Sequence, residues 1–219
     1  MTTPQLYLVS PVVDQPEAFG PLLAAACAAA PIAAVQLRLP AADERTLVNN
    51  LKTLAPLAQE RGAAVVLAVV GDAPVDLPLI AARGGADGVH AGLPHADLPD
   101  LRGRLKDGSI LGVGGSRTKD EAMGAGEAGA DYLLFGGPRP DGSLPDLALS
   151  LERAAWWAEI FETPCIAFAP SLGAIAAAAG TGAEFVGLGD AVWHHPGGPQ
   201  EALMQALEAL EPASGSVAT

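Results

Sequence analysis

The sequence predicts an α/β protein folded as a single (βα)8 TIM barrel. Three copies of a Gly-Ala-acid turn run directly into apolar strands, at residues 85–90, 129–136 and 182–189. Each copy follows an Ala-rich helical stretch, which its Gly can end in a left-handed conformation. The length of 219 residues suits one such barrel. Repetition of one helix–turn–strand unit places the expected chemistry at the C-terminal ends of the strands.

Eight βα units account for nearly the whole chain. The predicted strands are 5–10, 34–39, 64–70, 87–91, 110–114, 131–136, 164–169 and 184–188. The predicted helices are 17–30, 43–61, 74–83, 97–105, 119–128, 145–161, 172–181 and 199–210. Their even spacing favours closure into a barrel over a doubly wound sheet. We therefore expect one TIM-barrel domain over residues 1–211, followed by a disordered polar tail at 212–219.

Local signals support individual elements. Asp43 suits the N-cap of the second helix, and Gly62 is placed to end it. The third strand, 64–70, is nearly all apolar, as expected for a strand buried on both faces. Cys27 and Cys165 lie in apolar stretches without CxxC spacing, which predicts buried free thiols in a reducing compartment.

Composition excludes several classes of partner. The formal net charge is −13 with only 12 Lys and Arg residues, and no basic run occurs, so neither nucleic acid nor an anionic membrane is an expected partner. The N-terminus lacks a positively charged leader, and the apolar run 22–35 is too short to span a bilayer. These features predict a cytoplasmic protein. Trp156 and Trp157 lie in mid-helix, one packed on the sheet and the other available for a homodimer contact.

Polar residues at strand ends are the candidates for chemistry. Gln36 and Arg38 are two apart on the second strand and therefore face the same way. They would form a polar floor for a ligand or, alternatively, a satisfied salt bridge inside the barrel. Asp72 ends the third strand, where it suits a Mg²⁺ ligand, a partner for a positively charged ring, or a turn residue.

His90 ends the fourth strand between Gly88 and Gly92. These small neighbours suggest space beside the imidazole, although a core histidine bonded to a neighbouring strand is the alternative. Asp190 ends the eighth strand, and the pair that follows, His194 and His195, is expected at the surface because no partner stands at metal-ligand spacing.

Two glycine-rich segments follow strands. After the fifth strand, Gly114, Gly115, Ser116 and Arg117 open a helix, where backbone N–H groups would cradle an anion. After the sixth strand, Gly136–Gly137 either brings backbone close to a ligand or satisfies a loop that needs positive φ.

The order of these motifs resembles the thiamine phosphate synthase/TenI family. The resemblance covers about residues 6–210, and its most specific part is the segment 85–92 followed by 112–116 and then 129–132. The synthases of this family join a pyrimidine diphosphate to a thiazole phosphate with Mg²⁺, whereas TenI relatives act as thiazole tautomerases. A small phosphorylated thiazole or pyrimidine is therefore the implied ligand.

The resemblance also implies roles for individual residues. Gln36 and Arg38 would contact the diphosphate or pyrimidine, with Arg38, His90 and Ser116 as the catalytic candidates. Ser116 would touch the diphosphate. Asp72 would hold Mg²⁺, joined by Asp97 if that acid has slipped into the place of the family's acidic residue.

Several family positions are altered in this sequence. Pro40 stands in place of a lysine, and Gly71 and Ala73 replace an Asn and an Arg around Asp72. Residues 139–143 replace a Thr-x-Thr-Lys that holds a second lysine, and Pro170 interrupts a Gly-Gly phosphate loop. Because a charge-assisted hydrogen bond contributes roughly 1.5–3 kcal/mol, the loss of three cations would remove about 5–9 kcal/mol of diphosphate stabilisation. The cations that would replace part of this are Arg38, Arg117, Lys119 and Arg139.

Two functions follow from these residues. One is an enzyme of the synthase or TenI type whose diphosphate and Mg²⁺ motifs are eroded. The other is a non-catalytic, ligand-binding or regulatory barrel. Turnover with the two substrates and Mg²⁺ separates them, because only the first hypothesis predicts product.

Overall fold

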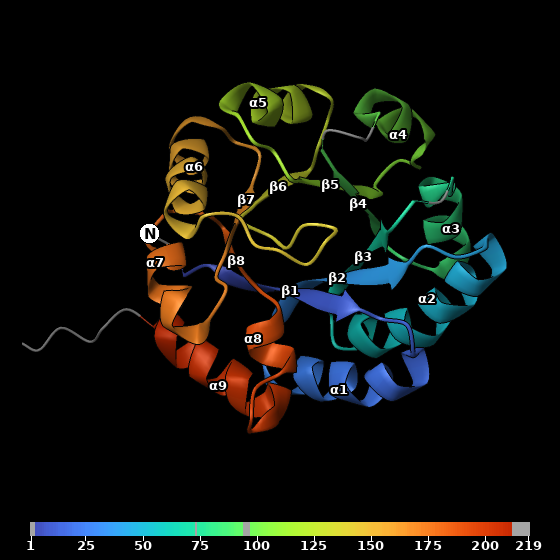
Figure 1. Ribbon diagram of the computed structural model, residues 1–219, viewed down its shortest axis with the longest axis horizontal. Helices are drawn as coiled ribbons and strands as arrows, with labels where there is room; N and C mark the ends of the chain where they lie inside the picture. The colour runs from blue at the N-terminus through green and yellow to red at the C-terminus, as the bar shows by residue number, and fades with distance from the viewer. Residues whose placement is uncertain (1–2, 73, 94–96, 212–219) are drawn as a thin grey trace, which may run out of the picture.

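The computed structural model describes residues 3–72, 74–93 and 97–211, which form a closed barrel of eight parallel strands inside a ring of helices (Figure 1). Neighbouring strands follow chain order, and β8 closes the barrel against β1. The predicted fold class is confirmed. The strands are β1 Gln5–Val12, β2 Ile32–Pro40, β3 Ala64–Val70, β4 Gly88–Gly92, β5 Ile110–Gly114, β6 Tyr132–Phe135, β7 Cys165–Phe168 and β8 Phe185–Leu188.

Helices connect successive strands around the outside. They are α1 Pro16–Ala29, α2 Glu44–Gln59, α3 Leu77–Gly84, α4 Leu98–Arg104, α5 Lys119–Glu127, α6 Leu147–Ile160, η1 Leu172–Ala174, α7 Ile175–Ala179, α8 Asp190–Trp193 and α9 Gly198–Leu210. The sequence did not predict α8, because four residues are too few to show helical periodicity. The predicted tail, 212–219, lies outside the described residues.

The repeated Gly-Ala-acid turn has one geometry in all three copies. Gly85, Gly129 and Gly182 each adopt φ between 83° and 86°, a left-handed conformation that L side chains avoid. The turn ends one helix and starts the next strand, as the sequence predicted.

The acidic residue of each turn bonds to the preceding strand. The Asp87 carboxylate accepts the Val65 N–H at 2.7 Å, and the Asp131 carboxylate accepts the Leu111 N–H at 2.7 Å. The Glu184 carboxylate accepts the Cys165 N–H at 2.9 Å. We call these three contacts the acid clamps. They satisfy amides near the starts of β3, β5 and β7, and they join β3 to β4, β5 to β6 and β7 to β8.

Removing an acid clamp is expected to destabilise the barrel. Asp131→Ala leaves the Leu111 N–H without its acceptor, which costs roughly 1–3 kcal/mol of unfolding free energy. Urea denaturation measures the loss. Asp14→Ala is the matched control, since Asp14 is exposed and accepts no side-chain hydrogen bond from the described residues. Equal stability of the two variants would contradict a structural role for the clamp.

Two separate apolar cores follow from the alternation of side chains along the strands. The larger lies between the barrel wall and the helices and includes both cysteines, which are buried and free. The smaller fills the barrel interior and comprises Tyr7, Val9, Val66, Tyr132, Leu134, Ile166 and Phe168. Because side chains fill the inner core, we expect a ligand to bind at the end of the barrel where the C-termini of the strands lie.

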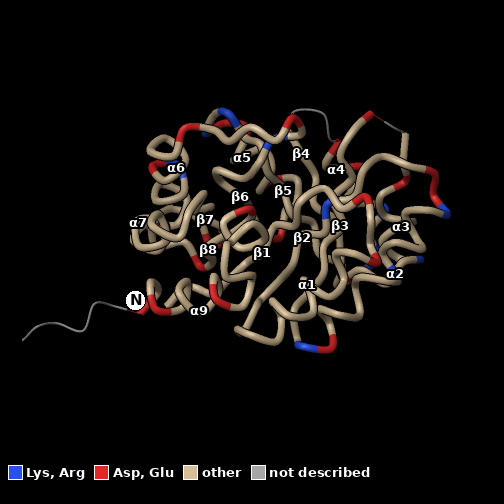
Figure 2. The backbone as a smooth tube through the Cα atoms, turned by 60° about the horizontal axis from the view of Figure 1, so that its bottom comes forward, with Lys and Arg blue, Asp and Glu red and all other residues tan. Residues whose placement is uncertain are grey.

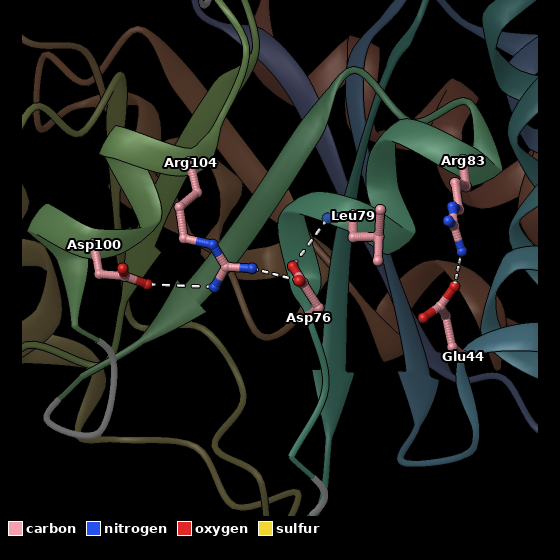
Figure 3. Close-up of polar contacts among 6 residues, drawn as sticks. All are labelled: Glu44, Asp76, Leu79, Arg83, Asp100 and Arg104. Carbon is pink, nitrogen blue, oxygen red and sulfur yellow. Dashed lines mark hydrogen bonds and ion pairs between the residues drawn. The ribbon is translucent and has the colours of Figure 1, made fainter.

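Charged residues lie mainly on the outer helices and loops, with acidic positions in the majority (Figure 2). Arg104 of α4 pairs with Asp100 and with Asp76, the N-cap of α3, while Arg83 of α3 pairs with Glu44 at the start of α2 (Figure 3). These pairs are largely exposed and contribute little to stability. Among the described helices, none is long and apolar enough to cross a membrane.

Candidate functional site

A chain of buried polar side chains crosses the barrel interior. The Tyr7 hydroxyl lies 3.4 Å from Gln36 Oε1 and 2.6 Å from the Tyr132 hydroxyl. The Tyr132 hydroxyl in turn lies 2.9 Å from His90 Nδ1. We call these four residues, from β1, β2, β6 and β4, the interior chain. It links the two strand residues that the sequence singled out, Gln36 and His90, through two tyrosines on other strands.

Glycines on β5 make the room that the interior chain needs. A Cβ on Gly112 would lie 2.0 Å from Tyr132 Cζ, and a Cβ on Gly114 would lie 2.8 Å from His90 Nε2. The register places His90 beside Gly112, and Gly112 beside Tyr132. The room for the imidazole therefore comes from β5 and not from Gly88, where a Cβ would lie 2.1 Å from the Ile110 carbonyl oxygen. His90 contacts the Tyr132 hydroxyl of β6.

Arg38 lies two residues beyond Gln36, near the C-terminus of β2. Its side chain is buried, and Nη2 donates to the Arg139 carbonyl at 3.3 Å from the loop between β6 and α6. That loop passes across the middle of the barrel in Figure 1. The Arg38 backbone N–H donates to Ser10 Oγ at 2.9 Å, which fixes β2 against the irregular end of β1.

The charges at this end act on one another. Burial lowers the pKa of the Arg38 guanidinium, and the negative charge of Asp190 opposes that shift. Burial, aided by the positive charge of Arg38, lowers the pKa of His90 to about 3. His90 is therefore neutral at physiological pH. Arg38 supplies the positive charge, so an anionic group entering the barrel mouth meets a guanidinium beside a neutral imidazole.

The glycine-rich loop after β5 is organised around its own helix. Thr118 is the N-cap of α5 in a capping box, and Glu121 Oε2 accepts the N–H groups of Arg117 and Thr118. Arg153 of α6 donates to the carbonyls of Ser116 and Arg117. The Arg117 amide, one of those expected to cradle an anion, and the adjacent Thr118 amide therefore already hold a carboxylate.

The two predicted metal ligands lie on different elements at strand ends. Asp72 is exposed directly after β3, whereas Asp97 is the N-cap of α4 and accepts the Asp100 N–H at 3.1 Å. The described residues contain no group of three or more His, Cys, Asp and Glu side chains placed to hold a metal ion. Mg²⁺ often binds through one or two carboxylates together with ligand phosphates, which is the arrangement that Asp72 suits.

The remaining predicted positions lie around the mouth. Gly136 adopts φ +88°, and a Cβ there would lie 3.1 Å from Ser150 Cβ and 3.4 Å from Phe168 Cβ. Backbone conformation and close packing therefore both explain the glycine at this position. A Cβ on Gly137 would lie 2.6 Å from Leu134 Cδ2. Asp190 begins α8, where its exposed carboxylate faces His194 at 3.5 Å.

Comparison with known proteins now decides the family. A family model described as thiamine monophosphate synthase matches residues 6–192. The chain belongs to this family. It is 37% identical to the thiamine-phosphate synthase of Rhodospirillum centenum, over 93% of this chain and 96% of that relative. It is 31% identical to the thiamine-phosphate synthase of Hyphomonas neptunium, over 94% of this chain and 93% of that relative.

Solved structures agree on the fold. The thiamine phosphate pyrophosphorylase from Pyrococcus furiosus superposes with a TM-score of 0.76, over 96% of this chain and 97% of that one, at 22% identity. The orotidine 5′-phosphate decarboxylase from Pyrococcus horikoshii superposes with a TM-score of 0.66 over 94% of this chain and 100% of that one, at 16% identity. At these identities the likeness shows the barrel and no activity.

In this thiamine monophosphate synthase family member, the sequence pointed to Gln36 and His90 of the interior chain but not to its two tyrosines. Tyr7 lies in the predicted first strand and Tyr132 in the predicted sixth, but neither is among the candidate site residues. The signal was present, because Tyr7 shares strand parity with Val9 and Tyr132 with Leu134, and all four face inward. An inward tyrosine needs a partner for its hydroxyl, which points to a polar network.

Proposed function

We propose that this chain forms thiamine monophosphate from a pyrimidine diphosphate and a thiazole phosphate. Arg38 carries the proposal. It is a buried guanidinium two residues beyond Gln36, at the C-terminal end of a barrel strand, in a chain that matches thiamine-phosphate synthases over nearly their full length. A buried cation is costly unless something pairs with it, and a diphosphate is a suitable partner.

The proposed reaction is a group transfer. The C–O bond between the pyrimidine methylene and the diphosphate breaks, the diphosphate leaves with the electron pair, and the thiazole nitrogen forms the new C–N bond. Negative charge accumulates on the departing oxygen, so a guanidinium held in a water-poor site stabilises the transition state more than the ground state. Arg38 has that role, and neutral His90 with Gln36 orients the ring that becomes cationic.

Mg²⁺, when bound, supplies further neutralisation of the diphosphate, and Asp72 is the carboxylate we propose to hold it. We also propose Ser116 and the amides of Gly114 and Gly115 as contacts of the diphosphate. Arg117 contributes through its exposed guanidinium, because its backbone N–H already donates to Glu121.

A second function is favoured by the carboxylates at the mouth. Glu121 occupies two loop amides, and Asp190 lies close enough to Arg38 to affect its pKa. Both weaken the site for an anion, which suits a barrel that binds a less charged ligand without turnover.

The deciding experiment is an assay of the purified chain with both substrates and Mg²⁺, in which thiamine monophosphate is quantified after oxidation to a fluorescent product. We expect product with the native chain and a strong loss with Arg38→Met. Absence of product, while a thermal shift shows that the thiazole phosphate binds, would overturn the synthase proposal in favour of the non-catalytic one.

A further inference from the structure

The three hydrogen bonds of the interior chain have a definite direction. Gln36 Oε1 can only accept, so the Tyr7 hydroxyl donates to it. Tyr7 has one proton, and its contact with Tyr132 therefore requires Tyr132 to donate. The single proton of Tyr132 is then used, so the contact with His90 Nδ1 requires the imidazole to donate.

We propose that Tyr7 and Tyr132 are positioning residues that hold His90 as the Nδ1–H tautomer, leaving its Nε2 as a hydrogen-bond acceptor for the ligand. The same chain orients the Gln36 amide so that its NH₂ group is the donor. The inference rests on the proposed function only for the identity of the ligand, since the direction follows from the donation of Tyr7 to Gln36 Oε1.

The outer atoms of both end residues reach accessible space. Among the described residues, no hydrogen bond joins Gln36 Nε2 or His90 Nε2, while every buried side-chain nitrogen and oxygen of that part of the chain has a partner. The two atoms are therefore not fully enclosed. Gly114 places no side chain against this atom, and a Cβ there would lie 2.8 Å from His90 Nε2.

This arrangement selects the polarity of the ligand. A group that meets His90 must donate a hydrogen, as an amino or hydroxyl group does, and a group that meets the Gln36 amide must accept one, as a ring nitrogen or carbonyl oxygen does. A ligand with the opposite pattern would leave buried polar groups unpaired, which is the strongest form of discrimination that a hydrogen-bonding site achieves.

The ionisation states of the interior chain support a fixed direction. Burial raises the pKa of both tyrosines above their usual value, so each hydroxyl keeps its proton. Burial, together with the charge of Arg38, lowers the pKa of His90 to about 3, so only one ring nitrogen carries a proton at neutral pH. With one proton on each group, the donation from Tyr7 to Gln36 Oε1 fixes the direction of the other two bonds.

Nitrogen-15 NMR of the histidine ring tests the proposal directly, because the two ring nitrogens of a neutral imidazole have distinct shifts and couplings in each tautomer. The chain contains 4 histidines, and a His90→Gln variant identifies the signals of His90. We expect Nδ1 to be protonated and Nε2 bare. A protonated Nε2 in the native chain would overturn the proposal.

Tyr7→Phe gives a second, non-local test, because no hydrogen bond joins Tyr7 directly to His90 among the described residues. Without the Tyr7 hydroxyl, Tyr132 turns its proton to His90 Nδ1, and we expect the imidazole to change to the Nε2–H tautomer. Ile166→Val, a change inside the same inner core that leaves the interior chain intact, is the control and retains the Nδ1–H form. An unchanged tautomer in folded Tyr7→Phe would also overturn the proposal.

If Tyr7→Phe does not fold, Gln36→Leu applies the same test, since it removes the acceptor that sets the direction. The spectra are recorded without substrates, so a chain that makes no product still reports its tautomer, and the two proposals fail separately. In an active chain, Tyr7→Phe is expected to weaken binding of the pyrimidine substrate by about tenfold, the equivalent of one lost hydrogen bond.

Discussion

Replacing Gly112 with alanine is expected to destabilise the barrel by about 3 kcal/mol, a large part of the 5–15 kcal/mol that holds a typical domain folded. The added Cβ would lie 2.0 Å from Cζ and 2.1 Å from the hydroxyl oxygen of Tyr132. The ring cannot easily move away, because it is buried and its hydroxyl contacts both Tyr7 and His90. Urea denaturation of the purified variants measures the loss.

Gly124→Ala is the matched control. Gly124 is exposed on α5, and an added Cβ meets nothing within 4 Å, so this variant is expected to be more stable by about 0.5–1 kcal/mol. A double-mutant cycle identifies the cause, because the cost of Gly112→Ala should largely disappear when Tyr132→Ala is also present. Gly112→Ala with native stability would contradict the placement of the Tyr132 ring.

Arg38→Met is expected to weaken binding of inorganic pyrophosphate by about 10- to 150-fold. The substitution removes a charged hydrogen-bond donor from the mouth, and such bonds contribute roughly 1.5–3 kcal/mol. Isothermal titration calorimetry with pyrophosphate, with and without Mg²⁺, measures the affinity. Methionine occupies similar volume and removes a buried charge, so we expect unfolding free energy to change little.

Two further variants test whether the effect on pyrophosphate affinity is specific to Arg38. Arg83→Met removes an exposed arginine of α3 that pairs with Glu44, and it should leave pyrophosphate affinity unchanged. Asp190→Asn should tighten binding severalfold at low salt, because it removes a negative charge that acts on Arg38. Equal affinities for Arg38→Met and Arg83→Met would show that pyrophosphate binds elsewhere.

The fold was predictable because its signals are local and repeated. Predicted strands 64–70 and 110–114 agree with β3 and β5 at both ends, and Asp43 caps α2 as expected. The helix predicted at 172–181 is instead a short 3₁₀ turn, η1, followed by α7. An alanine-rich run carries high helix propensity but no signal for such a change of pitch.

The site was predictable only in part. Strand parity identified Gln36 and Arg38 from neighbouring residues. The link from Gln36 to His90 was not visible, because it depends on β1 and β6 facing each other across a closed barrel. The role of Glu121 was visible and missed, since Thr118 followed three residues later by a glutamate is the pattern of a capping box, and that pattern competes with anion binding.

The acid clamps bear on how this chain can evolve. They join three strand pairs near the starts of the strands, whereas Arg38 lies near the C-terminal end of β2. Substitutions at the mouth therefore leave strand alignment intact, and a clamp is lost only by mutation of a residue that never meets a ligand. The acid clamps thus stabilise the barrel through residues that lie outside the proposed site, whereas Tyr132 serves both stability and the interior chain.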